Sequence, residues 1–404
     1  MNALRSVSLA AAIAAALFTA PGRAEIGPGF TETTIRIGNT NPYSGPASSY
    51  GTIGRTMAAY FDKVNDEGGI GGRSIEFISY DDAYSPPKTV EQTRRLVERD
   101  DVLLIVQALG TATNSAVREY LNGKKVPQLF VSSGATKWGE PDAYPWTMGW
   151  HPNYQSEARI YAGYLLENRP DARIAVLYQN DDYGRDYLKG LKDGLGDRAA
   201  EMILAEEAYE VMDPTVDSQV LKLQASGADT FINVATPKFA AQAIRRSAEL
   251  GWEPLHILNN VANAVDGVLV PAGVQNAVGI LTTFYYKDPT DPRWQGDAAL
   301  ARWRTFMADY FPEGDTSSTL TVYGYIAAQA LEHVLREAGD DLSRENVMRL
   351  AANIRKLELD MLLPGITVDT TPNDYFPIEQ MQMARFNGER WELFGPILSG
   401  EIGG

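Results

Sequence analysis

Two series of alternating β-like and helical segments constrain the fold of this chain more than any other sequence feature. In the first series, helical spacing separates short apolar runs that we expect to be strands, at Thr34–Gly38, Ser74–Ser79, Val102–Val106 and Gln128–Val131. The second series begins with a helical segment at Tyr154–Asn168 and continues with expected strands at Arg173–Tyr178, Glu201–Glu206, Asp229–Val234 and Leu255–Leu258. Because repeated βα units build a parallel sheet with helices on both faces, the pattern predicts an α/β protein with two doubly wound, Rossmann-like lobes.

Breaks in this pattern locate the expected connections between the lobes. They lie near Trp146–Pro152 and Thr282–Pro289, and further helical segments and a β-like run follow at 297–310, 320–338, 344–354 and 381–386. A length of 404 residues also exceeds the usual size of one domain. We therefore predict one lobe made of residues 32–150 plus 284–368 and a second made of residues 151–283 plus 375–395.

The first 24 residues have the composition of a cleavable secretory signal peptide. Arg5 supplies a positive start, Val7–Ala20 is an almost unbroken apolar run, and small residues lead to a cleavage site after Ala24. A membrane anchor needs about 20 apolar residues, whereas this run is shorter and rich in alanine. We expect residues 1–24 to direct export to a bacterial periplasm and then to be removed.

Net charge and cysteine content exclude several functional classes. The chain has 36 Lys and Arg against 52 Asp and Glu, which gives a net charge of −16, and it has no basic run. That balance argues against nucleic acid or an anionic membrane surface as partner. The sequence contains no cysteine, which rules out disulfides, cysteine–zinc sites, thiol catalysis and a lipid-modified N-terminal cysteine.

Catalytic and metal-binding motifs are absent from the sequence. We find no HExxH, GxSxG, P-loop or EF-hand pattern, and the three histidines lie far apart, at His151, His256 and His333. The pairs Asp81-Asp82 and Asp181-Asp182 follow expected strands, where aspartate also begins turns and caps helices. We therefore predict a binding protein rather than an enzyme, without a metal ion or a cofactor.

Four polar loops follow expected strands, where open α/β sheets bind their ligands. Small residues in such loops let backbone N–H groups approach an anion, and hydroxyl groups add further donors. The loops are Ser44–Gly51, Leu109–Asn114, Ser132–Thr136 and Gln179–Gly184. The last belongs to the second lobe, so we predict a cleft between the lobes that holds a carboxylate through neutral donors.

Several motifs occur in a characteristic order along the chain. They are Ile35–Gly38 followed by Ser44-Gly45-Pro46 and Tyr50-Gly51, then Asn65–Gly72, Ser79–Asp82 and Val176–Gly184. In this order they resemble the periplasmic solute-binding proteins of branched-chain amino acid ABC transporters, which have the type I fold, and the resemblance covers Thr34 to Phe394. It implies two lobes joined by three hinge crossovers that close over a ligand, and a closed form that engages a membrane permease.

The resemblance also implies roles for individual residues. In the first lobe it implies a tyrosine in the cleft wall and a carboxylate cradle, at Tyr50, Leu109, Gly110, Thr111, Ser133, Gly134, Ala135 and Thr136. In the second lobe Tyr183 would cover the ligand, and Thr236 falls where amino-acid binders have another aromatic residue. Asn259, followed by Asn260, stands where those binders have the acid that pairs with the ligand ammonium.

The loss of that acid determines the expected ligand. A buried ammonium group without a counter-charge is costly, so we predict an aromatic or aliphatic organic acid, with ring faces offered by Tyr50, Tyr183 and Trp150. One alternative is a branched-chain or other amino acid, with Asp182 or Glu207 meeting the ammonium. A second alternative is a ligand sensor with the same fold. We expect the protein to be a monomer.

Overall fold

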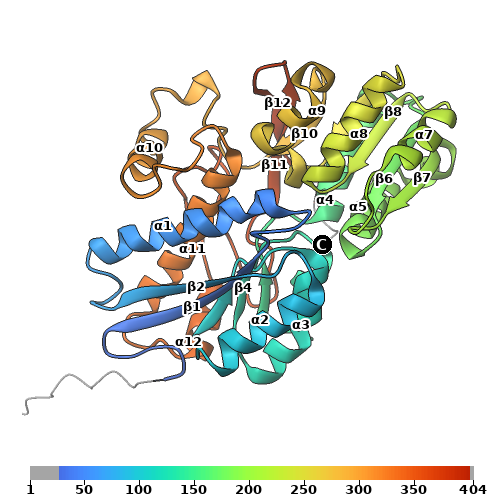
Figure 1. Cartoon of the computed structure of the whole chain (residues 1–404). Helices are drawn as coiled ribbons and strands as arrows, with labels where there is room; N and C mark the ends of the chain where they lie inside the picture. The colour runs from blue at the N-terminus through green and yellow to red at the C-terminus, as the bar shows by residue number, and fades with distance from the viewer. Residues whose placement is uncertain (1–26, 401–404) are drawn as a thin grey trace, which may run out of the picture.

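A five-stranded parallel sheet forms the first half of the molecule (Figure 1). The computed structural model describes residues 27–400. The strand order is β2-β1-β3-β4-β5, and every neighbouring pair is parallel. The strands are β1 Thr34–Asn41, β2 Ser74–Asp81, β3 Leu104–Val106, β4 Gln128–Val131 and β5 Thr147–Gly149. The order reverses between β1 and β3, which is the switch point of a doubly wound sheet.

A seven-stranded mixed sheet forms the second half, in the order β12-β11-β10-β9-β8-β6-β7. Its strands are β6 Ile174–Gln179, β7 Ile203–Tyr209, β8 Thr230–Val234, β9 Leu255–Leu258, β10 Leu281–Phe284, β11 Gln380–Phe386 and β12 Trp391–Ser399. The strands from β6 to β10 pair in parallel, and β11 and β12 add an antiparallel hairpin at the edge. Two separate sheets with helices on their faces confirm the predicted fold class.

Helices cover both sheets, and the chain returns to the first sheet after completing most of the second (Figure 1). Helix α11 packs against α1, and Arg344 at the start of α12 donates to the carbonyl oxygens of Val102 and Leu103 beside β3. The helices are α1 Gly51–Asp66, α2 Pro86–Glu98, α3 Thr111–Lys124, α4 Tyr154–Asn168, α5 Asp182–Leu195, α6 Ala199–Met202, α7 Asp217–Ala225, α8 Pro237–Glu249, α9 Val270–Ala272, α10 Ala298–Tyr310, α11 Thr319–Ala338 and α12 Arg344–Ala351.

The chain passes between the two sheets three times, after β5, after β10 and before β11. These passages agree with the predicted crossovers, whereas the lobe boundaries at residues 150, 284, 368 and 375 stay a prediction. The expected signal peptide, residues 1–24, lies outside the described residues. Within residues 27–400, no helix is both long and apolar enough to cross a membrane.

Strands β5 and β12 were not predicted, and each lacks the usual strand signal. Strand β5 is three residues long and follows Pro145 and Trp146. Strand β12 contains Gly395 and Pro396, which normally interrupt a strand. Its pairing with β11 shifts register between Gln382 and Met383, so both residues fall in a bulge, and the proline does not break the ladder.

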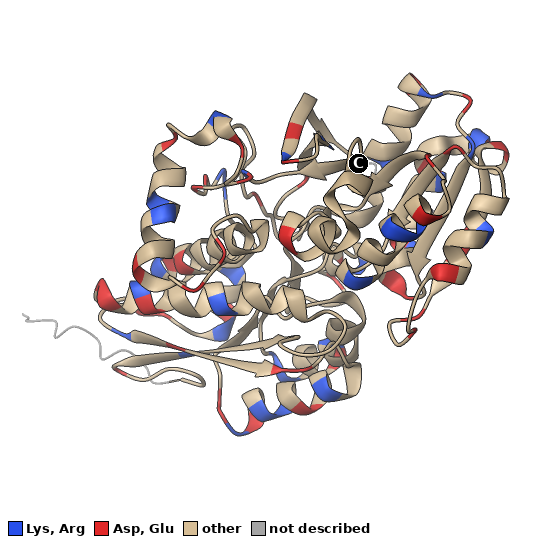
Figure 2. Ribbon diagram, turned by 45° about the horizontal axis from the view of Figure 1, so that its top comes forward, with Lys and Arg blue, Asp and Glu red and all other residues tan. Residues whose placement is uncertain are grey.

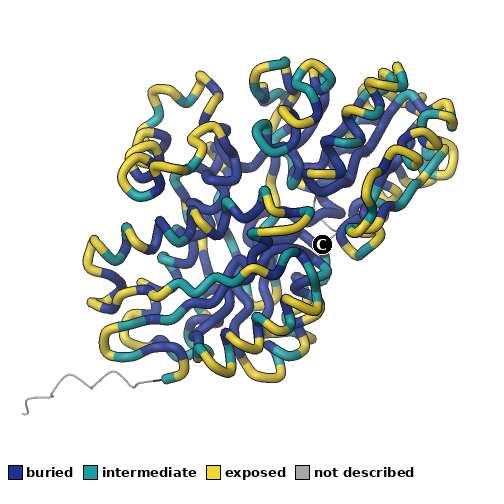
Figure 3. The backbone as a smooth tube through the Cα atoms, viewed as in Figure 1, coloured by how far each residue is buried: buried dark blue, intermediate teal, exposed yellow. Residues whose placement is uncertain are grey.

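The core follows the strands and the inner faces of the helices (Figure 3). Strands β3, β4 and β8 are buried along their whole length, as in parallel sheets covered on both faces. Charged residues lie mainly on the outer helices and loops of both halves (Figure 2). The carboxyl ends of the parallel strands in the two sheets face each other across the middle of the molecule, and this arrangement positions the site.

Candidate functional site

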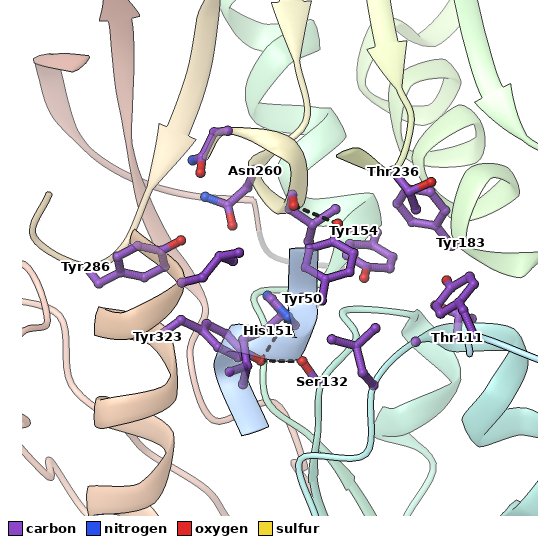
Figure 4. A pocket seen from close by; sticks show the side chains of 17 residues that line it. Tyr50, Thr111, Ser132, His151, Tyr154, Tyr183, Thr236, Asn260, Tyr286 and Tyr323 are labelled. Carbon is purple, nitrogen blue, oxygen red and sulfur yellow. Dashed lines mark hydrogen bonds between the residues drawn. The ribbon is translucent and has the colours of Figure 1, made fainter. Parts of the chain in front are cut away.

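A cavity lies between the carboxyl ends of the strands in the two sheets (Figure 4). The empty space between these strand ends, open solvent included, is about 540 Å³. Residues from both sheets and from the returning helix α11 line it: Tyr50, Ile53, Tyr84, Leu109, Gly110, Thr111, Ser132, His151, Tyr154, Tyr183, Thr236, Asn260, Val261, Asn263, Tyr286, Leu320 and Tyr323. The wall is therefore mostly aromatic and aliphatic, with a few hydroxyl and amide groups.

The first wall of the cavity contains the N-terminus of helix α3. Gly110 precedes the helix with φ 99°, and no side chain caps the helix. A Cβ atom at Gly110 would lie 2.4 Å from the ring of Tyr84, so both the backbone conformation and the close packing require glycine. The Thr111 hydroxyl lies 2.7 Å from that of Ser133. The backbone N–H groups of Thr111, Ala112 and Thr113 thus have no hydrogen-bond acceptor among the described residues.

The second wall is built on helix α5, whose N-terminus is already occupied. The Asp181 carboxylate accepts hydrogen bonds from the backbone N–H groups of Tyr183 and Gly184 at 3.1 and 3.3 Å. The Asn259 side chain lies 2.7 Å from the Tyr183 hydroxyl. With its nitrogen donating to the carbonyl oxygens of Asn233 and Ala235, the Asn259 oxygen accepts from that hydroxyl. Asn259 therefore positions the Tyr183 ring.

Six tyrosines line the cavity, and several of their hydroxyl groups are held by the protein. The Tyr50 hydroxyl donates to the Val261 carbonyl oxygen at 2.8 Å, which joins the two halves across the cavity. The Tyr154 and Tyr183 rings meet edge to face with centroids 5.3 Å apart. Burial raises the pKa of Tyr50, Tyr154 and Tyr183 above the usual tyrosine value, so these rings are neutral at physiological pH.

His151 is the remaining titratable residue in the lining, and it is neutral as well. Burial lowers the pKa of His151 to about 3. The ring stacks on Tyr323 at a centroid distance of 4.9 Å, and Nε2 lies 3.0 Å from the Tyr323 hydroxyl. That hydroxyl also lies 2.9 Å from the Ser132 hydroxyl. Over residues 27–400, no Lys, Arg, Asp or Glu side chain contributes to the cavity lining.

A buried carboxyl group, Glu157, lies directly behind the second wall. Its oxygens accept hydrogen bonds from the hydroxyl groups of Tyr161 and Tyr187 at 2.6 Å each and from the Asn260 backbone N–H at 2.7 Å. Desolvation by burial raises the pKa of Glu157 to about 7, although these hydrogen bonds oppose the shift. Glu157 does not line the cavity, but it fixes the backbone of Asn260, which does.

The structure brings about half of the sequence-predicted residues into the cavity lining. These are Tyr50, Leu109, Gly110, Thr111, Tyr183, Thr236 and Asn260. The predicted residues outside the lining are Ser133, Gly134, Ala135, Thr136, Trp150 and Asn259.

The residues outside the lining have structural partners that explain their positions. Ser133 bonds the Trp138 indole, and Thr136 N–H donates to Asp186 on α5 at 2.7 Å, so this segment contacts the second half instead of the cavity. Trp150 is fully buried and packs edge to face on Phe130. Asn259 is turned toward Tyr183.

Ten lining residues escaped prediction: Ile53, Tyr84, Ser132, His151, Tyr154, Val261, Asn263, Tyr286, Leu320 and Tyr323. Ser132 lies in the predicted loop Ser132–Thr136, and His151 and Val261 directly follow the predicted residues Trp150 and Asn260, so a wider window would have included them. Tyr84 has φ 58° in a turn after β2, an unusual conformation that no sequence signal announced. Tyr286, Leu320 and Tyr323 come from the returning chain, whose placement depends on the whole fold.

The acidic residues singled out in the sequence have structural partners. Asp82 accepts from the Tyr84 N–H and the Thr89 hydroxyl, which is a turn-and-cap role. Asp182 pairs with Lys137 at 2.9 Å, and Glu207 pairs with Lys222 at 3.0 Å, so neither lines the cavity. In the described part of the chain, no group of three or more histidine or acidic side chains could hold a metal ion.

With this fold and this site in view, comparison with known proteins identifies the family. Residues 34–390 match the periplasmic binding protein family, so the chain belongs to the periplasmic binding proteins, and it shares its fold with a solved type 1 periplasmic binding protein from Bordetella pertussis. This confirms the resemblance predicted from the motifs. The family is one of binding proteins, with an extracytoplasmic location.

Relatives and solved structures extend over most of the chain. An amino acid binding protein of Pseudomonas aeruginosa is 24% identical over 76% of this chain and 79% of its own length. A Leu/Ile/Val-binding protein homolog of Brucella suis is 25% identical over 77% of this chain and 80% of its own length.

Two solved structures show the same fold at lower identity. A branched chain amino acid ABC transporter protein from Thermus thermophilus with bound valine has a TM-score of 0.80 at 15% identity, covering 92% of this chain and 97% of its own. A fatty acid ABC transporter substrate-binding protein from Thermomonospora curvata has a TM-score of 0.75 at 21% identity, covering 93% and 95%. Because the names of these two neighbours refer to different ligands, the comparison establishes the fold of this protein but not the identity of its ligand.

Proposed function

We propose that this protein is the solute-binding receptor of an ABC importer and that it captures a small organic acid with an apolar or aromatic body. The observation that carries the proposal is the charge of the cavity. The lining drawn from residues 27–400 holds no Asp or Glu, while the open N-terminus of α3 offers N–H groups to an anion. This pattern favours a ligand with a carboxylate and without an ammonium group.

The carboxylate would sit at the start of α3. A helix N-terminus carries about half a positive charge, and its free N–H groups bind anions. Gly110 lets the backbone come close, and the Thr111 hydroxyl adds a donor. Each hydrogen bond to a charged group contributes about 1.5–3 kcal/mol, so two or three of them would account for most of the specificity for an acid.

The body of the ligand would lie among the tyrosine rings. Tyr50 and Tyr154 stand between the two ends of the cavity, and Ile53 and Leu320 add aliphatic surface (Figure 4). Aromatic pairs contribute about 0.5–1.5 kcal/mol beyond the burial of their area, which favours a flat or ring-bearing acid. One structural neighbour is named a fatty acid ABC transporter substrate-binding protein, which supports an aliphatic carboxylate as well.

Closure over the ligand would bring the two halves together through the contacts that already span them. Besides the Tyr50–Val261 hydrogen bond, the Thr136 N–H reaches Asp186, and Lys137 pairs with Asp182. A ligand that touches both walls stabilises this closed form by its differential affinity for it. The closed form would then deliver the ligand to a membrane permease, with the receptor acting as a monomer in the periplasm.

An amino-acid ligand is the second candidate, and the names of the relatives favour it. Its ammonium group would have to be held by neutral acceptors alone. Asp182 and Glu207, the two acids that could pair with an ammonium group, instead pair with lysines outside the cavity. Burying an ammonium group without a counter-charge is unfavourable. We therefore rank the organic acid first.

Calorimetric titration of matched pairs tests this proposal. We would compare 4-methylpentanoate with leucine and 3-phenylpropanoate with phenylalanine, since each pair differs only in the ammonium group. Benzoate and cinnamate extend the series. The proposal expects the deaminated partners to bind more tightly. Micromolar binding of leucine or valine, with no binding of any organic acid, would replace it with the amino-acid function.

A further inference from the structure

Two asparagines on the second wall present side-chain oxygens to the cavity that accept from no described donor. Asn260 and Asn263 follow strand β9, and both line the cavity. The Asn260 side-chain nitrogen donates to the Thr283 carbonyl oxygen at 2.6 Å, and that of Asn263 donates to the same oxygen at 3.3 Å. Because each amide nitrogen must face this carbonyl, the orientation of both amides is fixed. Their Oδ1 atoms are the ends left for a ligand.

These two oxygens have no protein partner. Among residues 27–400, no donor bonds the Oδ1 atom of Asn260 or Asn263, and neither atom belongs to the polar atoms sealed inside the protein. Both residues are nevertheless only 2% exposed, so closure of the cavity takes their oxygens out of bulk water. A buried acceptor without a donor is unfavourable, and a ligand group that donates to it would remove this cost.

The backbone of this pair is held rigidly from behind. The Asn260 N–H donates to Glu157 at 2.7 Å, and the Trp391 indole donates to the Asn263 carbonyl oxygen at 2.9 Å. With the side-chain nitrogens bonded to the Thr283 carbonyl oxygen as well, neither amide can exchange its oxygen and nitrogen without losing a hydrogen bond. The two Oδ1 atoms are therefore preorganised acceptors for a donor group of the ligand.

The acceptor pair stands apart from the anion site. Figure 4 shows Asn260 on the same side as Tyr286, whereas Thr111 lies on the opposite side near Tyr183 and Thr236, with Tyr50 and Tyr154 between them. The cavity therefore has two poles of different chemistry: N–H donors at the start of α3 and amide acceptors at Asn260 and Asn263.

We propose that the ligand is a hydroxy-substituted carboxylic acid whose hydroxyl group, at the end remote from the carboxylate, donates to the side-chain oxygens of Asn260 and Asn263. This inference rests on the proposed function, because it takes the carboxylate to lie at α3. A hydroxyl fits better than an ammonium group, since two amide dipoles do not offset the desolvation of a full charge. An ether or a methyl group at this end would leave the acceptors unpaired.

The test compares ligands that differ only at the remote position. We would titrate 4-hydroxybenzoate, 4-methoxybenzoate and 4-methylbenzoate, and the corresponding 4-substituted cinnamates, by calorimetry. The hydroxyl compound of the better-fitting series is expected to bind about tenfold more tightly than its methoxy and methyl analogues. Asn263→Leu should reduce this preference to about twofold, because one acceptor is lost while Asn260 still satisfies Thr283. Asn373→Leu is the matched control, because Asn373 is exposed and lies outside the cavity lining, and it should leave the preference unchanged.

The outcomes separate this inference from the proposed function. If unsubstituted benzoate or cinnamate binds but the hydroxyl compounds show no preference, the inference is wrong and the organic-acid function stands. A preference for 4-(aminomethyl)benzoate would also overturn it. If no acid binds while leucine does, the proposed function fails and the inference fails with it. The order of affinities of the hydroxyl, methoxy and methyl compounds for the wild-type protein tests the inference even if Asn263→Leu does not fold.

Discussion

Helices α3 and α5 hold equivalent positions on the two sides of the cavity and begin in opposite ways. Each has 14 residues, follows a strand or bridge of a parallel sheet, and starts at the cavity wall. Helix α5 is capped by Asp181, which accepts from the N–H groups of Tyr183 and Gly184. Helix α3 begins at Thr111, directly after Gly110, and has no side-chain cap.

Because of this difference, the two halves of the molecule offer different groups to the ligand. An uncapped helix start in a nearly enclosed cavity leaves N–H groups to be satisfied, which favours an anionic ligand there. A helix start that already holds its own carboxylate repels a second anion, so the second half contributes rings and amides instead. Two sheets whose five parallel strands follow the same order thus provide different chemistry, and the sequence position that decides it is the cap residue.

Removing one N–H group from the start of α3 should have the largest effect. Proline is tolerated at the first helical position, so Thr111→Pro deletes this donor while keeping the helix. We expect the affinity for a carboxylate to fall about 10- to 100-fold. Thr111→Val loses only the hydroxyl and should cost less. Equal losses in both variants, measured by calorimetry, would mean that the N–H group makes no contact with the ligand.

Neutralising the cap of α5 should make the two helix starts more alike. Asparagine is as good a cap as aspartate, so Asp181→Asn keeps the helix and removes a buried negative charge. We expect organic acids to bind a few-fold more tightly, with their uncharged amides unaffected. Asp182→Asn is the control, because Asp182 is 54% exposed and paired with Lys137. An unchanged or weakened affinity in Asp181→Asn would show that the α5 start does not influence the anion.

The Glu157 carboxyl group makes the second wall sensitive to pH. Its pKa of about 7 lies above its ordinary value of 4.5, so the folded protein holds a proton that the unfolded chain releases. Its contribution to the free energy of unfolding is complete below pH 4.5 and is lost as the pH rises through about 7. Thermal unfolding should therefore show stability falling over this range more steeply in the wild type than in Glu157→Gln.

The buried His151 acts in the opposite direction, because its lowered pKa of about 3 destabilises the folded protein as the pH falls below 6.5. The informative quantity is consequently the difference in the free energy of unfolding between the wild type and Glu157→Gln at each pH. Parallel profiles for the two proteins would show that Glu157 keeps an ordinary pKa.

The smallest effect is expected for the ion pair that links the halves at the surface. Lys137 and Asp182 are 28% and 54% exposed, so their interaction contributes about 0–1 kcal/mol and is screened by salt. Lys137→Ala should weaken ligand binding less than about fivefold in dilute buffer and still less in concentrated salt. A loss larger than that of Thr111→Pro would mean that closure, and not the anion site, dominates affinity.

The sequence pattern predicted most of the fold because the alternation of apolar and polar residues in a helix or strand can be recognised within a short stretch of sequence. The bounds expected for β4, α4 and β9 agree with the structure at both ends. The expected strand at Glu201–Glu206 begins instead with the short helix α6, and β7 runs to Tyr209. Strand β12 was missed because Gly395 and Pro396 read as a loop, and only its pairing with β11 places them in a bulge.

The site was predictable as far as it is formed by loops that follow strands. Gly110 and Thr111 could be located from the residues that follow an apolar run, and Tyr183 from a helix start. Tyr286 and Tyr323 could not, because they reach the cavity only when the chain returns to the first sheet. Likewise, no local signal shows that Asn259 turns toward Tyr183 while its neighbour Asn260 faces the cavity.

A crystal structure with a bromine-labelled acid, such as 4-bromobenzoate or 4-bromocinnamate, tests the central claim most directly. The anomalous signal of bromine fixes the direction of the ligand independently of its density. We predict that the carboxylate oxygens lie within hydrogen-bonding distance of the N–H groups in the first turn of α3, with bromine toward Asn260. A carboxylate bound at Asn260 and Asn263, with bromine toward Thr111, would contradict the assignment of the two poles.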